Sequence, residues 1–127
     1  MSTEITDFTY YINQNLVVTK IATYTHLYAD SYCPLTWSIT ENGGAVDSNV
    51  ITAFDVATGQ VTIQTNNMSY DLQTKNLQIT CTSTLSTHAN KAASDSFVLS
   101  LFDECWHTVL TAPAFTQPSW TYNLWAA

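Results

Sequence analysis

The chain has 127 residues, the length of a single domain, and 46% of them are hydrophobic, which excludes an intrinsically disordered segment. Only 10% are charged and the net charge is −7, with three lysines and no arginine, so nucleic acids and anionic membrane surfaces are poor partners. Threonine, serine, asparagine and glutamine supply most of the polarity, a composition typical of secreted or cell-surface β proteins.

The ends of the chain bear on its location. No apolar run approaches the roughly 20 residues that a membrane-spanning helix needs. The first four residues, Met1–Glu4, lack the basic and apolar regions of a signal peptide. Either a processed chain or a cytoplasmic protein fits this start, and we favour a processed, extracellular or cell-surface chain.

Period-2 alternation of apolar and polar residues recurs along the chain and predicts β-strands. In chain order the expected strands are residues 8–16, 17–27, 34–40, 50–54, 60–65, 77–82 and 97–101. Turn signals rich in Gly, Asn and Asp lie at 41–44 and 55–59. Residues 88–93 are expected to form a loop, and no segment has the period of a useful helix.

About seven strands at roughly ten-residue spacing predict an all-β, antiparallel, Ig-like sandwich. Burying each large apolar side chain contributes about 1.5–3 kcal/mol, so ten of them suffice for an independent core. The expected core residues are Tyr24, Trp37, Ile39, Phe54, Ile63, Leu77, Ile79, Phe97, Leu99 and Leu101.

The end of the chain reads as a separate element. After the strand that ends near Phe102, residues 113–127 contain two prolines and then a new strand-like run. We therefore expect a sandwich domain over 1–112 and a linker with an aromatic strand over 113–127. Exposed on a monomer, the strand's apolar side chains would lower solubility, so we expect them to pair with a neighbouring sheet edge or to begin a following repeat: Trp120, Tyr122, Leu124 and Trp125.

The run F-D-V-A-T-G-Q-V-T-I at residues 54–63 resembles a strand–turn–strand segment of cadherin-like domains of the dystroglycan type. Residues 70–84 and 96–101 are similar to the penultimate and last strands of that family, so the resemblance covers about residues 33 to 105. It implies a cadherin-like β-sandwich of the kind that occurs in tandem in large extracellular surface proteins.

The chain departs from the calcium-binding members of that family. Residues 66–71 contain no D-R-E-like triplet, and residues 81–84 contain no acidic pair. Calcium needs six to eight oxygen ligands, usually with several carboxylates, and Asp103 with Glu104 is too few. We therefore predict no calcium, no other metal and no cofactor.

The three cysteines are Cys33, Cys81 and Cys105, an odd number that leaves one thiol free or bonded to another molecule. In the topology that the resemblance implies, Cys33 and Cys105 lie at opposite ends of the domain, too far apart for an intrachain bond. Two alternatives stay open: Cys33 pairs with Cys81, or Cys105 of one copy pairs with Cys33 of the next. We favour the second, because strand alternation points Cys81 into the core.

No catalytic constellation is evident. His26, His88 and His107 are far apart in sequence, and no G-x-S-x-G motif or converging acid pair accompanies them. We therefore expect that the protein is not an enzyme. Asn67-Met68-Ser69 fits the N-glycosylation pattern and follows an expected strand, so Asn67 is a candidate glycan acceptor.

These features favour a structural or adhesive extracellular building block that associates with identical or similar domains into a head-to-tail array or filament. The alternative is a carbohydrate-binding module, in which exposed aromatic rings stack against sugars. The aromatic candidates for that alternative are Tyr10, Tyr11, Tyr28, Tyr32, Trp106 and Trp120.

Overall fold

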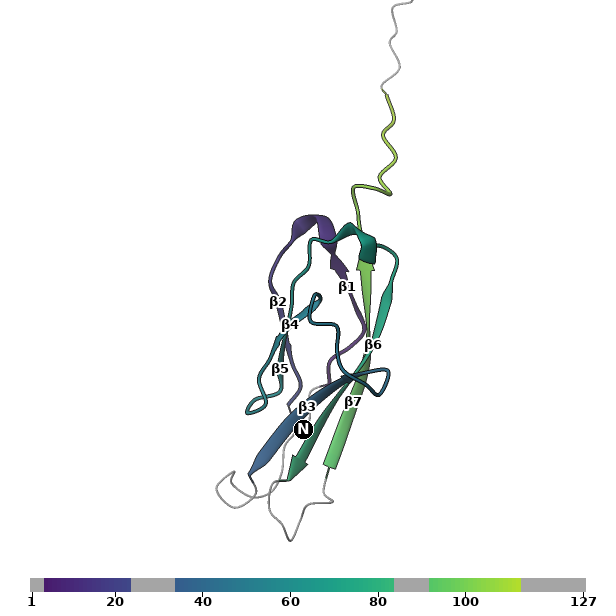
Figure 1. Ribbon diagram of the computed structural model, residues 1–127. Helices are drawn as coiled ribbons and strands as arrows, with labels where there is room; N and C mark the ends of the chain where they lie inside the picture. The colour runs from purple at the N-terminus through teal and green to yellow at the C-terminus, as the bar shows by residue number, and fades with distance from the viewer. Residues whose placement is uncertain (1–3, 24–33, 84–91, 113–127) are drawn as a thin grey trace, which may run out of the picture.

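The computed structural model describes residues 4–23, 34–83 and 92–112. Their regular secondary structure consists of β-strands and two single turns of 3-10 helix, joined by turns and irregular connections (Figure 1). The expected all-β fold class is confirmed. The elements are β1 (Phe8–Tyr11), η1 (Ile12–Gln14), β2 (Val18–Ile21), β3 (Leu35–Glu41), β4 (Ile51–Phe54), β5 (Gln60–Ile63), η2 (Met68–Tyr70), β6 (Thr74–Ser83) and β7 (Ala92–Phe102).

The strands form two sheets that face each other as a sandwich. One sheet has four strands in the order β1-β7-β6-β3, and the other has three in the order β2-β5-β4. Every pairing is antiparallel except that of β1 with β7, which is parallel. Strands β3 and β7 both pair antiparallel with β6, so they run parallel to each other on either side of it.

The core lies between the sheets and is built by strand alternation. In β6, Leu77, Ile79 and Cys81 are buried, whereas Asn76 and Gln78 on the opposite face are exposed. Seven of the ten expected core residues are buried: Trp37, Ile63, Leu77, Ile79, Phe97, Leu99 and Leu101. Ile39 and Phe54 are only partly buried and pack against the core, and Tyr24 lies outside the described residues.

Several strand boundaries differ from the prediction. Strand β7 begins at Ala92, so residues 92–93 are strand and not loop. The first expected strand, residues 8–16, ends at Tyr11 and turns through η1, where Asn15 adopts a left-handed conformation with φ of 47°. The second, residues 17–27, is strand only over Val18–Ile21 within the described part. The interruption has a physical cause: β1 belongs to one sheet and β2 to the other, so the chain must turn between them.

Tyr10 secures this turn from inside the core. Its side chain is 2% exposed, so the hypothesis that Tyr10 offers an exposed ring to sugars is wrong. Its hydroxyl lies 2.9 Å from the Leu16 carbonyl oxygen and 3.1 Å from the Thr65 carbonyl oxygen, and it accepts the Thr65 N–H at 3.1 Å. These bonds join the β1–β2 connection to the chain just after β5.

The β4–β5 hairpin fits closely against β3. Gly59 has φ of +76°, and a Cβ at this position would lie 2.6 Å from the Trp37 ring. Asp55 closes the turn, because its carboxylate accepts the Ala57 N–H at 2.8 Å and the Thr58 hydroxyl at 2.9 Å. The glycine of the T-G dipeptide therefore serves a packing role, because the absence of a Cβ lets the Trp37 indole pack directly against the hairpin.

We predict that Tyr10→Phe lowers the free energy of unfolding by about 2 kcal/mol, because the buried Thr65 N–H loses its acceptor. Urea denaturation followed by tryptophan fluorescence measures the change. Tyr11→Phe is the matched control, since Tyr11 is 40% exposed, and it should leave stability unchanged. Equal effects of the two substitutions would contradict the role given to the Tyr10 hydroxyl.

Candidate functional site

The end of the sandwich where β7 finishes is anchored by two aspartates. Asp103, which is buried, accepts the N–H groups of Cys105 at 3.1 Å and Trp106 at 3.2 Å through its Oδ1. Asp71, just after η2, accepts the Asp103 N–H at 2.8 Å. The chain therefore leaves β7 through a hydrogen-bonded turn held against the neighbouring connection. We call residues 103–107 the exit turn.

His107 completes the exit turn. Its Nε2 lies 2.7 Å from Asp71 Oδ2, and its ring stacks on Phe102 with centroids 4.9 Å apart. The hydrogen bond from the Asp103 N–H is the main cause that lowers the pKa of Asp71, and the contact with His107 lowers it further. This carboxylate is therefore ionised near neutral pH. His107 thus has a structural contact with an acid. His26 and His88, the other two histidines considered, lie outside the described residues.

Beyond the exit turn, residues 108–112 run away from the sandwich (Figure 1). Trp106, Val109 and Leu110 are 79%, 86% and 89% exposed. We call these three side chains the exit apolar group. The exit apolar group therefore places three large, exposed apolar side chains on one short segment.

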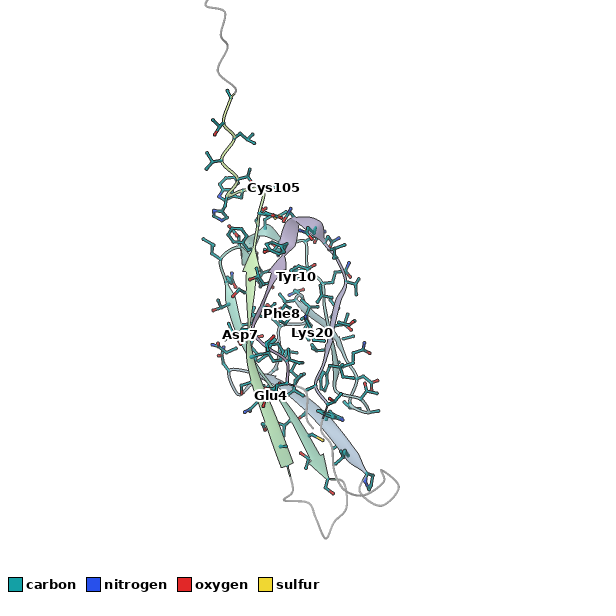
Figure 2. All side chains as sticks on the ribbon, turned by 180° about the vertical axis from the view of Figure 1, so that it is seen from behind. Glu4, Asp7, Phe8, Tyr10, Lys20 and Cys105 are labelled. Carbon is teal, nitrogen blue, oxygen red and sulfur yellow. The ribbon has the colours of Figure 1, made fainter. Side chains whose placement is uncertain are left out.

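The cysteines of the described residues occupy different environments. Cys105 is exposed at the exit turn (Figure 2), where the Asn13 amide Nδ2 lies 3.4 Å from its Sγ. Cys81 is buried in β6, as its alternation indicated, and burial raises the pKa of its thiol. Both are free thiols in the described part of the chain, and Cys33 lies outside it.

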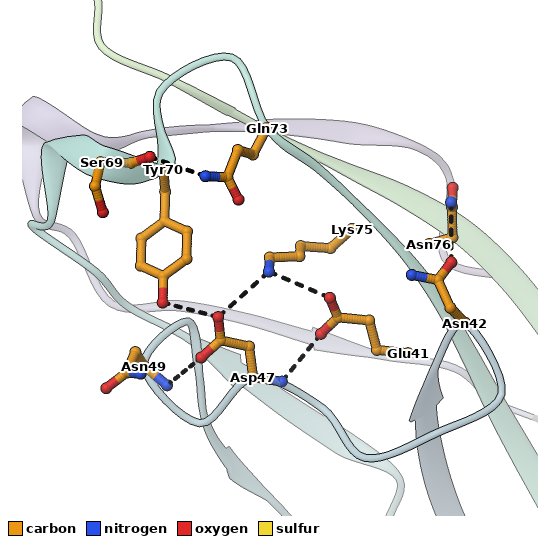
Figure 3. Close-up of polar contacts among 9 residues, drawn as sticks. All are labelled: Glu41, Asn42, Asp47, Asn49, Ser69, Tyr70, Gln73, Lys75 and Asn76. Carbon is orange, nitrogen blue, oxygen red and sulfur yellow. Dashed lines mark hydrogen bonds and ion pairs between the residues drawn. The ribbon is translucent and has the colours of Figure 1, made fainter.

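A second polar cluster joins the end of β3, the connection that follows it and the start of β6 (Figure 3). Lys75 Nζ is 3.2 Å from Glu41 Oε1 and 3.3 Å from Asp47 Oδ2. The Tyr70 hydroxyl donates to the same Asp47 oxygen at 2.8 Å. Lys75 is buried in the row of core-facing β6 residues. Its ammonium group is therefore largely removed from water, and the two carboxylates compensate for the lost hydration.

The charges of this cluster are fixed near neutral pH. Burial alone would lower the pKa of Lys75, but hydrogen bonds and charges from Glu41 and Asp47 raise it overall. The hydrogen bond from Tyr70, above all, lowers the pKa of Asp47, and the same bond raises that of Tyr70. None of these three groups is poised to exchange protons near pH 7, so the cluster fits a role in holding residues 42–50 onto β6 and η2.

The other sequence-predicted sites are dispersed. Asn67 is exposed and caps η2 by accepting the Ser69 N–H at 3.0 Å. Tyr28, Tyr32 and the expected terminal strand residues Trp120, Tyr122, Leu124 and Trp125 lie outside the described residues. Sequence reasoning did not identify the Asp71–Asp103–His107 contacts, because residues 71 and 103 meet only through the fold.

Within residues 4–23, 34–83 and 92–112, no three His, Cys, Asp or Glu side chains gather as metal ligands would. The same ranges contain no helix that is long and apolar enough to cross a membrane.

Comparison with known proteins adds no assignment. No family model matches the chain, and no curated protein matches it.

We predict that Asp47→Asn lowers stability at pH 7 by about 1 kcal/mol, because the variant lacks the charge that pairs with Lys75. The pKa of Asp47 in the folded protein is below its ordinary value near 3.9. The ionised carboxylate therefore stabilises the fold above that pH, and this stabilisation is lost as the pH falls through the folded-state pKa. The variant should therefore lose less stability than wild type between about pH 5 and pH 3. Urea titrations across this range measure the difference.

A double-variant cycle supplies the control for this prediction. Asp47→Asn and Tyr70→Phe should be non-additive at pH 7, since the Tyr70 hydroxyl donates to Asp47. Additive effects, or parallel pH curves for wild type and Asp47→Asn, would count against the assignment.

Proposed function

We propose that this chain is a structural or adhesive building block of an extracellular or cell-surface assembly, in which identical or similar domains join end to end. The observation that carries the proposal is the parallel pairing of β1 with β7. The described chain starts beside Asp95, which accepts the Ile5 N–H at 2.7 Å. It leaves β7 at Phe102, and Asp95 and Phe102 are about 23 Å apart along the strand. Parallel first and last strands suit a unit that continues in one direction.

The exit apolar group supports the same proposal. Trp106, Val109 and Leu110 are exposed on the segment that follows β7. This segment runs away from the sandwich (Figure 1), where the next unit of an end-to-end array would lie. The exit turn fixes where this segment starts, because Asp71 and Asp103 bind its backbone. The expected aromatic strand at 120–125 follows later in the chain, outside the described residues, and would extend the same contact.

Topology is also compatible with a disulfide between copies. Leu35, at the start of β3, pairs with Ser83, next to the Thr82–Ala92 pair, so β3 and β7 begin at the same end. Cys33 precedes β3 by two residues, and Cys105 follows β7 at the other end. In a head-to-tail array these two cysteines approach each other. An oxidant such as oxidised glutathione would take one electron and one proton from each thiol as the sulfur–sulfur bond forms.

The cadherin-like resemblance and glycosylation belong to this proposal as well. Parallel β3 and β7 with β6 between them is the arrangement that the resemblance implied. Asn67 lies exposed on a short turn, so an attached glycan would meet no core residue.

We expect that the triple variant Trp106→Ser, Val109→Ser and Leu110→Ser converts assemblies of the protein into monomers. The substitutions remove the apolar surface that the neighbouring copy would cover. Analytical ultracentrifugation of the full chain under reducing conditions measures the species. The control is Val56→Ser, an apolar residue 60% exposed in the β4–β5 turn, which should assemble as wild type does. A wild-type protein that stays monomeric at high concentration would refute the proposed assembly.

Cysteine variants test the bond between copies. After oxidation, Cys33→Ser alone and Cys105→Ser alone should stay monomeric on non-reducing gels, whereas their mixture should give a dimer. That pattern arises only when Cys33 of one copy bonds Cys105 of another. A dimer from Cys33→Ser alone indicates a Cys105–Cys105 bond instead, and no dimer in the mixture removes the disulfide from the proposal.

A further inference from the structure

The outer face of the four-stranded sheet carries no charged side chain over three strands. The outward residues of β3, β6 and β7 are Thr, Ser, Asn or Gln, with the exceptions of Ala92, Val98 and Phe102. The charged residues of these strands, Glu41, Lys75 and Asp95, share the ladder positions of the core-facing residues. We call this surface the neutral face.

Cross-strand pairing arranges these side chains in rows. Thr9, Ser100 and Thr74 align across β1, β7 and β6, and the next row along β7 joins Val98 to Asn76. Neighbouring groups touch: Thr80 and Ser94 hydroxyls are 2.9 Å apart, and the Asn76 amide donates to Asn42 at 3.2 Å. Each hydroxyl or amide has more than one donor or acceptor position, so the rows keep capacity for a ligand.

Two shallow depressions lie along the neutral face, and the first extends beyond it to Asp7, which precedes β1. One, of about 420 Å³, is lined by Asp7, Asn42, Asn76, Gln78, Ser96 and Val98. The other, of about 390 Å³, is lined by Thr9, Tyr11, Leu72, Gln73, Thr74 and Phe102. Both have volumes in the range of small-molecule sites, about 300–1,000 Å³.

The two depressions lie in sequence along one strand. Val98 lines the first and Phe102 the second, four residues apart on β7, which is about 13 Å. At the second, the Tyr11 ring is 40% exposed and meets the edge of Phe102, with centroids 6.4 Å apart at 81°. An extended ligand would therefore meet amides and hydroxyls first and an aromatic ring at its far end.

We propose that the neutral face binds a neutral oligosaccharide, laid along β7 across both depressions. Sugar hydroxyls donate and accept at the same time, as do the Asn, Gln, Ser and Thr groups of the rows. The apolar C–H surface of a pyranose ring fits the exposed ring of Tyr11. A net charge of −7 with no cation on the neutral face repels anionic glycans and phosphates.

This site is separate from the end-to-end contact. The exit apolar group projects beyond the end of β7, whereas the depressions lie beside the strand itself. Sugar binding can therefore be measured whether or not the protein assembles.

Affinity electrophoresis of the full chain, in gels containing soluble polysaccharides, tests the proposal. The neutral probes are mixed-linkage β-glucan, xylan and galactomannan, and the anionic probes are heparin and polygalacturonate. We expect retardation by at least one neutral probe and none by the anionic ones. No retardation by any neutral probe, or retardation by anionic probes alone, would overturn the proposal.

Variants then locate the site on the positive probe. Tyr11→Ala should weaken binding about tenfold by removing the ring, and Gln78→Ala about fivefold by removing one hydrogen-bonding group. Thr36→Ala with Thr82→Ala is the control, on the same face but outside both depressions, and should bind as wild type does. Thermal melts establish that each variant is folded. Unchanged affinity in folded Tyr11→Ala and Gln78→Ala, or equal loss in the control, would show that the sugar binds elsewhere.

Discussion

The parallel pairing of β1 with β7 determines how the ends of this domain are used. Two hydrogen bonds hold the first residues to β7 before the ladder begins: Asp95 accepts the Ile5 N–H at 2.7 Å, and Asp7 accepts the Val98 N–H at 2.8 Å. Because both strands then run in one direction, the chain enters level with Asp95 and leaves beyond Phe102. Everything proposed for assembly depends on this directionality.

The few charged residues of the chain act mainly on its own backbone. Asp103 and Asp71 bind N–H groups of the exit turn, Asp55 binds those of the β4–β5 turn, and Asp95 binds the first segment. A carboxylate that accepts such bonds is stabilised in its charged form and orders a connection that has no ladder of its own. Using its charges this way leaves the outward residues of β3, β6 and β7 uncharged, which is the property on which the sugar-binding proposal rests.

Local pattern predicted the parts of the fold that local sequence controls. Alternation at 77–82 located β6 and placed Cys81 in the core. The turn signal at 41–44 begins at the last residue of β3, and the one at 55–59 lies between β4 and β5. It could not place Tyr10, because the partners of its hydroxyl include Thr65, 55 residues away. The polar clusters were missed for the same reason. A lysine at a core-facing strand position is unexpected from local pattern, and its partners Glu41 and Asp47 come from other parts of the chain.

Phe102 lies on the neutral face and contacts the exit turn, and this links the two proposals physically. One contact of its ring is the stacked His107 of the exit turn, and another is Tyr11 at the end of the second depression. The contacts that fix where the chain leaves the domain therefore also position the aromatic end of the proposed sugar site. A unit packed against the exit apolar group would restrain the same turn, so assembly would order that end of the site without touching the amide rows around Asn76 and Gln78.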